Sequence, residues 1–198
     1  MIEDVLTSER ILDATEEVLR RFGPAKANVV DVARVLGVSH GSVYRHFPSK
    51  AALRDAVTAR WLAKGLVPLA VVVAERGPAT ERLRRWLELL IASKRSRAFD
   101  DPELFATYME LAKEAREVAR IHVDRIAEQA IQIIADGVAQ GEFTTSDPAA
   151  TGRAVLYATA RFHNPLHAPE WSDPNIDAAF ENVWSLILCG LSSRNNPV

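Results

Sequence analysis

Residues 28–50 read NVVDVARVLGVSHGSVYRHFPSK, and the order of capping, small and apolar residues in this stretch predicts two short crossed helices. Asn28 and Ser39 are residue types that cap helix N-termini, and Gly37 supplies the left-handed conformation that ends the first helix. The inner face of the pair is apolar and consists of Val32, Ala33, Leu36, Val38 and Val43. This spacing predicts a helix-turn-helix, and the alternative is an ordinary helical hairpin with a glycine corner.

The second of these helices has an outer face without a carboxylate. If Val43 points inward and each residue turns the helix by about 100°, Gly41 and Arg45 lie nearly opposite the core. The residues on and beside this outer face are His40, Gly41, Ser42, Tyr44, Arg45 and His46. The stretch 32–54 contains neither Asp nor Glu, which is the chemistry expected of a helix beside phosphates and base edges. Gly41 costs the helix about 1 kcal/mol relative to alanine, a loss that is explained if the backbone must approach a base pair.

Residues 8–55 resemble the DNA-binding domain of the TetR family of transcription regulators. The matching segments are ERILDATEEVLRRFG (9–23) and DVARVLGVSHGSVYRHFPSKAAL (31–53), and the most specific part runs from Tyr44 to Lys50. The resemblance implies phosphate contacts by Tyr44, His46 and Lys50, with His40, Gly41, Ser42 and Arg45 near base edges. The family often carries threonine and arginine early in its second helix, where this chain has Asn28 and Val30. The resemblance therefore implies that specificity depends more heavily on the third helix.

The charge distribution agrees with a DNA-facing N-terminal part. The chain of 198 residues has a net charge of −2, yet residues 26–64 hold seven Lys or Arg against two Asp. A local basic stretch on an acidic chain favours a nucleic-acid-facing module attached to another part, although a solvated helix face gives the same count.

Composition predicts a soluble, cytoplasmic chain. With 48% apolar and 25% charged residues the chain can bury a core, which excludes a disordered tail. A single cysteine excludes an internal disulfide and suits a reducing compartment. Residues 1–4 are acidic where a secretory peptide would be basic, and the longest apolar run, 65–74, is too short to span a bilayer. We therefore expect no membrane segment.

The hydrophobic spacing is helical almost everywhere, and no alternating run of strand type is found, so the fold is expected to be all-α. Residues 1–48 are expected to form a three-helix DNA-binding domain and residues 49–198 a larger helical domain. Helices are expected near 8–22, after Gly77-Pro78, around 119–134, over 147–162 and over 176–191. Gly23-Pro24 should end the first of them.

The resemblance implies that the second domain encloses a small-molecule pocket and dimerises through its last two long helices. Independently, residues 176–191 are apolar on two adjacent rows, which suits a four-helix interface between two copies or, alternatively, a fully buried central helix. The expected interface residues are Ala150, Ala154, Ala158, Ile176, Phe180, Val183, Trp184 and Ile187.

Aromatic and polar residues on the central segments are candidates for the effector pocket, because apolar walls with a few polar groups suit an organic ligand. They are Trp86, Phe105, Tyr108, Met109, His122 and Phe162, and each of them also fits an ordinary core position. A zinc site at His163 and His167 would need one helix to continue through Pro165, which proline opposes. We expect no metal ion, no cofactor and a largely apolar effector.

Sequence motifs of enzymes are missing: no glycine-rich phosphate loop, HExxH pair or GxSxG elbow occurs. Cys189 lies in an apolar helix, where a thiol is normally inert. The sequence therefore predicts a dimeric, ligand-responsive transcription regulator, most often a repressor in this family, that reads a near-palindromic operator and is released by a small molecule. The alternative is a helical small-molecule-binding or protein-docking module that does not contact DNA.

Overall fold

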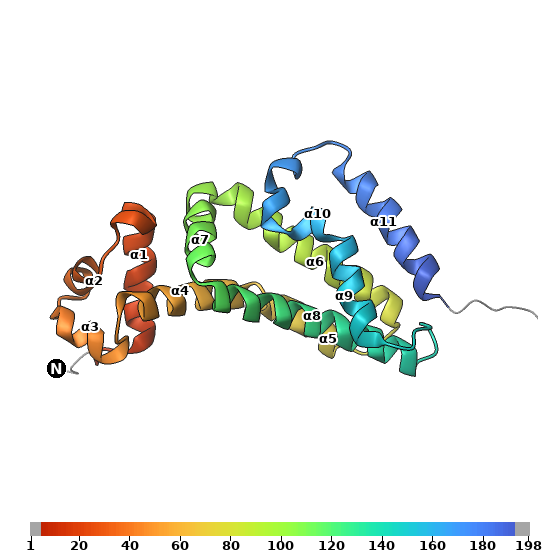
Figure 1. The fold of residues 1–198 in the computed structure, drawn as a ribbon, viewed down its shortest axis with the longest axis horizontal. Coiled ribbons are helices and arrows are strands. Elements are labelled where there is room, and N and C mark those ends of the chain that lie inside the picture. Colours follow the sequence, from red (N-terminus) through yellow and green to blue (C-terminus); the bar gives the residue numbers. More distant parts are fainter. Residues whose placement is uncertain (1–4, 193–198) are drawn as a thin grey trace, which may run out of the picture. The chain divides into compact units, whose positions relative to one another are not determined.

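The structure, a computed structural model, describes residues 5–192 and is all-α, as the hydrophobic spacing predicted (Figure 1). Within these residues the β geometry is limited to an isolated bridge between Phe143 and Ser192. The N-terminal helices are α1 (Ser8–Lys26), α2 (Val29–Leu36), α3 (His40–His46), α4 (Lys50–Lys64) and α5 (Val67–Ala74). The others are α6 (Ala79–Asp100), α7 (Pro102–Glu114), α8 (Arg116–Ala139), α9 (Pro148–Ala158), α10 (Ala160–His163), the 3₁₀ helix η1 (Pro165–Glu170) and α11 (Ile176–Leu191).

Helix boundaries follow the capping residues. Asn28 Oδ1 accepts from the Asp31 amide at 3.0 Å, Ser39 Oγ from the Ser42 amide at 3.1 Å, and Asp147 Oδ1 from the Ala150 amide at 2.9 Å. Gly37 adopts the left-handed conformation with φ 66°, and α2 ends there because its amide bonds back to the last turn. The predicted caps at Asn28 and Ser39 are therefore confirmed, and Asp147 caps α9 in the same way.

The helix expected over 147–162 is instead two helices, α9 and α10, separated at Thr159. The Thr159 side chain is buried, and its hydroxyl donates to the Val155 carbonyl at 2.8 Å. A threonine that bonds back to the preceding turn bends a helix, and here the chain leaves helical geometry at that residue. After α10 the chain continues into the 3₁₀ helix η1.

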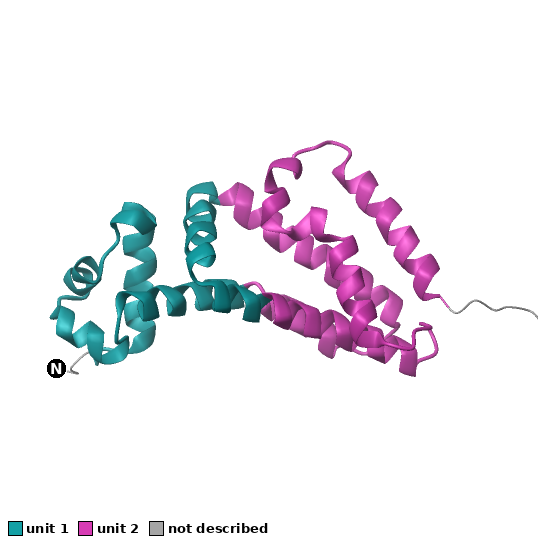
Figure 2. Cartoon of the chain, viewed as in Figure 1, with its two compact units in different colours: residues 1–64, 101–122 teal, residues 65–100, 123–198 magenta. Residues whose placement is uncertain are grey.

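The chain forms two compact units, drawn in different colours in Figure 2: residues 1–64 with 101–122, and residues 65–100 with 123–198. The boundary expected between residues 48 and 49 thus falls inside the first unit. The reason is that α7 packs against α1 and α4. Trp61 of α4 stacks on Tyr108 of α7, with ring centroids 4.4 Å apart, in one core with the helix-turn-helix.

The second unit is built around α6. Leu83, Trp86 and Leu87 are fully buried and pack with α8 and α11. Arg82 is also buried, and its guanidinium bonds Asp136 at 2.9 Å, so that the charge is paired inside the unit. By length and composition, no single helix of residues 5–192 could cross a membrane, although the bent pair Lys50–Lys64 and Val67–Ala74 passes that test jointly.

Candidate nucleic-acid interface

Helix α3 turns one apolar side chain inward and the rest outward. Val43 is fully buried, as its place in the pattern predicted. The seven candidate DNA contacts lie on the opposite side or just after the helix: Ser42 is half-buried, and His40, Gly41, Tyr44, Arg45, His46 and Lys50 are exposed. The side chains singled out from the helical angle are therefore available to a partner of the first unit.

Hydrogen bonds hold the central polar groups of this face in place. Ser39 Oγ lies 2.9 Å from Ser42 Oγ, and the Arg45 guanidinium donates to Ser42 Oγ at 3.2 Å. His40 and Tyr44 meet edge to face, with ring centroids 6.3 Å apart. Sequence reasoning gave Ser39 a capping role alone, whereas the structure shows that it also positions Ser42 and, through it, Arg45.

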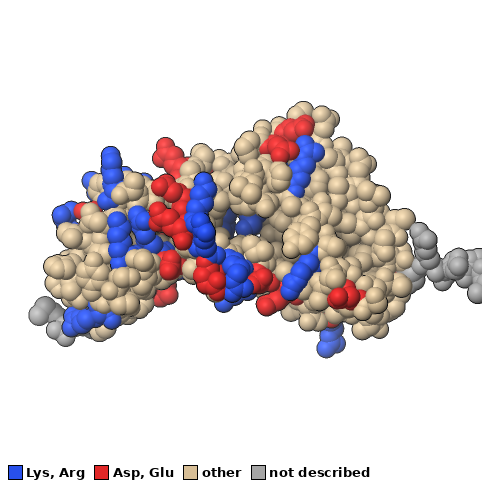
Figure 3. Space-filling view, viewed as in Figure 1, with Lys and Arg blue, Asp and Glu red and all other residues tan. Residues whose placement is uncertain are grey.

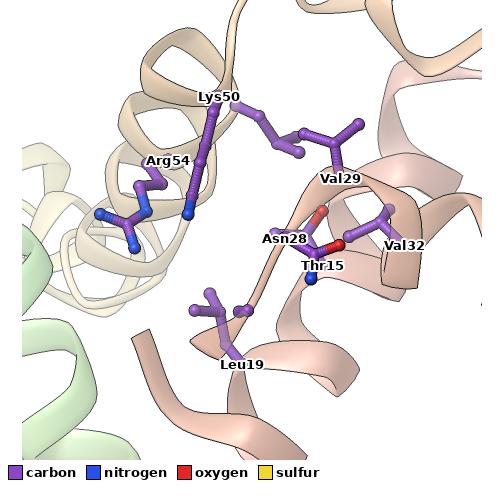
Figure 4. A pocket seen from close by; sticks show the side chains of 9 residues that line it. Thr15, Leu19, Asn28, Val29, Val32, Lys50 and Arg54 are labelled. Atoms are coloured by element: carbon purple, nitrogen blue, oxygen red, sulfur yellow. The ribbon is translucent and has the colours of Figure 1, made fainter. Parts of the chain in front are cut away.

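Lys50 begins α4 beside a small, open hollow in the first unit. Figure 4 shows Lys50 and Arg54 on the α4 side of this hollow, with Asn28 facing them from the start of α2. Arg54 is engaged within the unit, because it donates to the Pro24 carbonyl and to Glu114 Oε2, the latter at 2.6 Å. Lys50 is exposed at the mouth of the hollow, and Ser49 Oγ caps the same helix end.

Positive charge predominates around α2 and α3. In the space-filling view, Lys and Arg side chains gather over the part of the first unit that carries these helices (Figure 3). One of the two acids in residues 26–64, Asp31, is paired with Arg34 at 2.7 Å. Val30 is exposed to 53% on α2, so an apolar side chain also faces outward in this part of the unit.

The candidate effector residues are divided between the two units. Trp86 and Phe162 are buried in the core of the second unit, where the Trp86 indole donates to Gln129 Oε1 at 2.9 Å. The other four lie on α7 and α8 in the first unit: Phe105, Tyr108, Met109 and His122. Burial raises the pKa of Tyr108 well above its ordinary value, so its phenol stays neutral. The structure does not bring all six into one core.

The expected dimer residues also separate into two sets. Ala150, Ala154 and Ala158 are exposed along one face of α9. On α11, Ile176, Phe180 and Trp184 are buried in the core of their own unit, and Val183 and Ile187 are half-buried. The guanidinium of Arg84 lies 5.2 Å from the Phe180 ring centroid and 5.5 Å from that of Trp184. The buried side chains of α11, Ile176, Phe180 and Trp184, therefore pack inside their own unit and are not at the surface.

Two exposed apolar side chains on the same helices were not foreseen. Tyr157 of α9 is exposed to 78% and Leu186 of α11 to 73%. Tyr157 lies seven residues after Ala150, on the same helical face, and this spacing is the signal that could have identified it. On α11, the sequence pattern does not show which of its apolar rows packs inward.

His163 and His167 have separate partners. His163 Nε2 lies 3.2 Å from Thr159 Oγ1, and His167 Nδ1 lies 2.7 Å from Glu170 Oε1. In the part of the chain that the structure describes, no three His, Cys, Asp or Glu side chains gather closely enough to hold a metal ion.

Comparison with known proteins places this helix-turn-helix in a family. Residues 11–57 match the family described as bacterial regulatory proteins, tetR family, and residues 79–184 match the tetracyclin repressor-like C-terminal domain. The chain belongs to the TetR family. Membership accounts for the all-α fold and for the order of the two matched segments.

Three similar proteins differ in their sequence identity to this chain and in the share of each chain that is covered. An uncharacterized HTH-type transcriptional regulator of Mycobacterium tuberculosis is 33% identical over 78 residues, which is 39% of this chain and 39% of that relative's length. SmeT, the repressor of the Stenotrophomonas maltophilia multidrug efflux pump SmeDEF, has a TM-score of 0.67 at 19% identity, covering 98% of this chain and 94% of its own. The transcriptional regulator FadR of Bacillus subtilis, solved with stearoyl-CoA, has a TM-score of 0.61 at 18% identity, covering 93% and 99%. The structures share the fold.

Proposed function

We propose that this TetR-family chain is a ligand-responsive transcription regulator, a repressor that binds a near-palindromic operator as a homodimer. The observation that carries the proposal is the outer face of α3, where exposed Arg45 donates to half-buried Ser42, whose hydroxyl also bonds Ser39. A short helix with such a face fits the major groove, which is wide enough to admit an α-helix.

The groups on this face divide by chemistry into two kinds of DNA contact. Arg45, held by Ser42, presents a guanidinium suited to the paired acceptors of guanine. Exposed Val30 on α2 is suited to the methyl group of thymine. Tyr44, His46 and Lys50 carry donors suited to phosphates, which fix the register without reading sequence.

Dimer formation is assigned to the exposed faces of α9 and α11. Alanines every fourth residue on α9 permit close approach of a second helix, and Tyr157 and Leu186 add large apolar surface. A two-fold dimer would present two α3 helices to successive major grooves, about 34–36 Å apart. The buried residues Phe180 and Trp184 support that face from within.

Effector control is assigned to the C-terminal helices. Two structures of similar fold were solved with small molecules, SmeT with triclosan and FadR with stearoyl-CoA, which supports a small-molecule response here. Within the first unit, α7 packs on both α1 and α4, and the Trp61–Tyr108 stack joins them. A shift of α7 would therefore move the helices that carry the helix-turn-helix. Operator and effector must then weaken each other's binding by the same factor.

The experiment that tests the proposal is enrichment of bound genomic fragments by the purified chain, followed by mobility shifts over a salt series. Specific binding through phosphates predicts an affinity that falls steeply as salt rises. Retention of no genomic fragment at low ionic strength would refute DNA binding and favour the alternative, a helical module that binds small molecules or proteins.

A further inference from the structure

The buried stripe of α6 ends in two cations. Leu83, Leu87 and Leu90 are buried and share one face of the helix. Lys94 and Arg97 continue that face at the same three- and four-residue spacing, and both are half-buried. The inward side of α6 therefore changes from hydrocarbon to ammonium and guanidinium groups within about two turns. Lysine and arginine side chains are usually exposed, so their partial burial here is unusual.

Helix α10 brings a third basic group to the same place. It packs against α6 (Figure 1). It carries buried Phe162, followed by half-buried His163. Burial and the neighbouring charge of Lys94 lower the pKa of His163 to about 4, so its imidazole is neutral at pH 7. Burial and the charge of Arg97 lower the pKa of Lys94 to about 8, which leaves the ammonium group mostly charged at pH 7.

A glycine leaves room for the guanidinium. A Cβ atom built on Gly65 would lie 2.9 Å from Arg97 Nη2, closer than side chains pack. The absence of a side chain at this residue therefore allows Arg97 to take its present position. Three features now coincide in the second unit: a hydrocarbon stripe, two cations at its end and a neutral imidazole beside them.

We propose, on the basis of the effector response proposed above, that the effector is an amphipathic organic anion whose acidic group is bound by Lys94 and Arg97. Its apolar body would lie against the hydrocarbon side chains of α6 and α10, next to Phe162. Both cations would attract an acidic group in a partly dry environment, and the planar guanidinium fork matches an acidic group with two oxygens.

The test uses two fluorescent probes with the same rings. Anilinonaphthalene sulfonate is an amphipathic anion, and phenylnaphthylamine lacks its sulfonate. Titration of the full chain should show tighter binding of the anion. Lys94→Met and Arg97→Met should each weaken binding of the sulfonate by about tenfold, because each removes a hydrogen bond to a charged group. The affinity for phenylnaphthylamine should stay unchanged. Gly65→Ala, which displaces the guanidinium, should give a smaller loss in the same direction.

Arg76→Met is the matched control, because it removes an exposed cation from the same unit. It should bind both probes as tightly as the parent chain. Thermal unfolding should show that all variants are folded. Lys94→Gln repeats the test with a polar, uncharged side chain in place of methionine. Equal losses for both probes, an equal loss in Arg76→Met, or no saturable binding of the sulfonate by the parent would overturn the proposal.

Operator release is the second readout. Saturating sulfonate should release operator from the parent chain and leave Lys94→Met bound, whereas retention of operator by the saturated parent would overturn the effector assignment. Probe selectivity is measured without DNA. Failure of the parent to bind any genomic fragment would therefore refute the regulator while the charge-selective site stood, and the two failures are distinguishable.

Discussion

Replacement of Gly41 by alanine should raise the stability of the chain and lower its affinity for operator. Gly41 lies in the first turn of α3, and its φ is not in the positive range. A Cβ atom there would lie 3.7 Å from Ser39 Oγ, an ordinary contact, and apart from its chain neighbours and the backbone of α3 no other described heavy atom lies within 4 Å. Alanine therefore fits without strain, and the smaller entropy of its unfolded state stabilises the fold by about 0.4–1 kcal/mol. For a chain of this size the melting temperature should rise by roughly 1–4 °C.

DNA binding should change in the opposite direction. If α3 lies in the major groove with Gly41 against a base edge, a methyl group must displace the helix and misalign Ser42 and Arg45 beside it. We expect a loss of at least about tenfold in affinity, equivalent to about 1.4 kcal/mol. Circular dichroism gives the melting temperature, and fluorescence anisotropy of a labelled operator at fixed salt gives the affinity. A more stable variant that binds operator as tightly as the parent would show that Gly41 does not approach DNA.

Five other substitutions test separate features of the chain. Lys50→Ala should weaken binding to all DNA sequences alike and reduce the slope of log affinity against log salt by about one, as measured by fluorescence anisotropy over a salt series. Arg45→Ala should instead change the preferred bases, and an unchanged preference in a randomised operator library would remove its role in reading sequence. Leu186→Glu should give folded monomers in sedimentation because the side chain is exposed, whereas Phe180→Asp should unfold the second unit because it buries a charge. His163 has a lowered pKa of about 4, so the unfolded chain binds more protons between pH 6.5 and 4, and stability should fall as the pH drops through that window. In thermal unfolding measured at several pH values, the melting temperature of His163→Gln should fall less steeply with decreasing pH than that of the parent chain.

The local fold could be predicted where short-range chemistry decides it. Asn28 and Ser39 cap the helices they precede, and Gly37 ends α2, because these effects depend on neighbours within four residues. The apolar stripe of residues 176–191 matches the bounds of α11. Thr159 was not foreseen as a break, because its hydroxyl bends the chain only where burial leaves it no water to bond.

The candidate DNA face could also be predicted, because one buried residue, Val43, fixes the orientation of a whole helix. The effector and dimer residues could not, since their roles depend on which helices meet. Trp86 and Tyr108 have similar aromatic character, yet they lie in different cores. The apolar row of α11 fits an interface or an interior equally well, and only the burial of Phe180 in the core of its unit shows that this side chain belongs to the interior.

The inclusion of α7 in the unit that carries α3 has a practical consequence for protein engineering. A fragment cut after Lys64 would lack the partner of Trp61 and uncover the apolar side of α4. Such a fragment should be poorly soluble and bind DNA weakly unless residues 101–122 are supplied with it. Chimeras that exchange DNA-binding units between members of the TetR family should therefore transfer both segments of the unit, residues 1–64 and 101–122, although the candidate DNA-facing surface lies in the first segment alone.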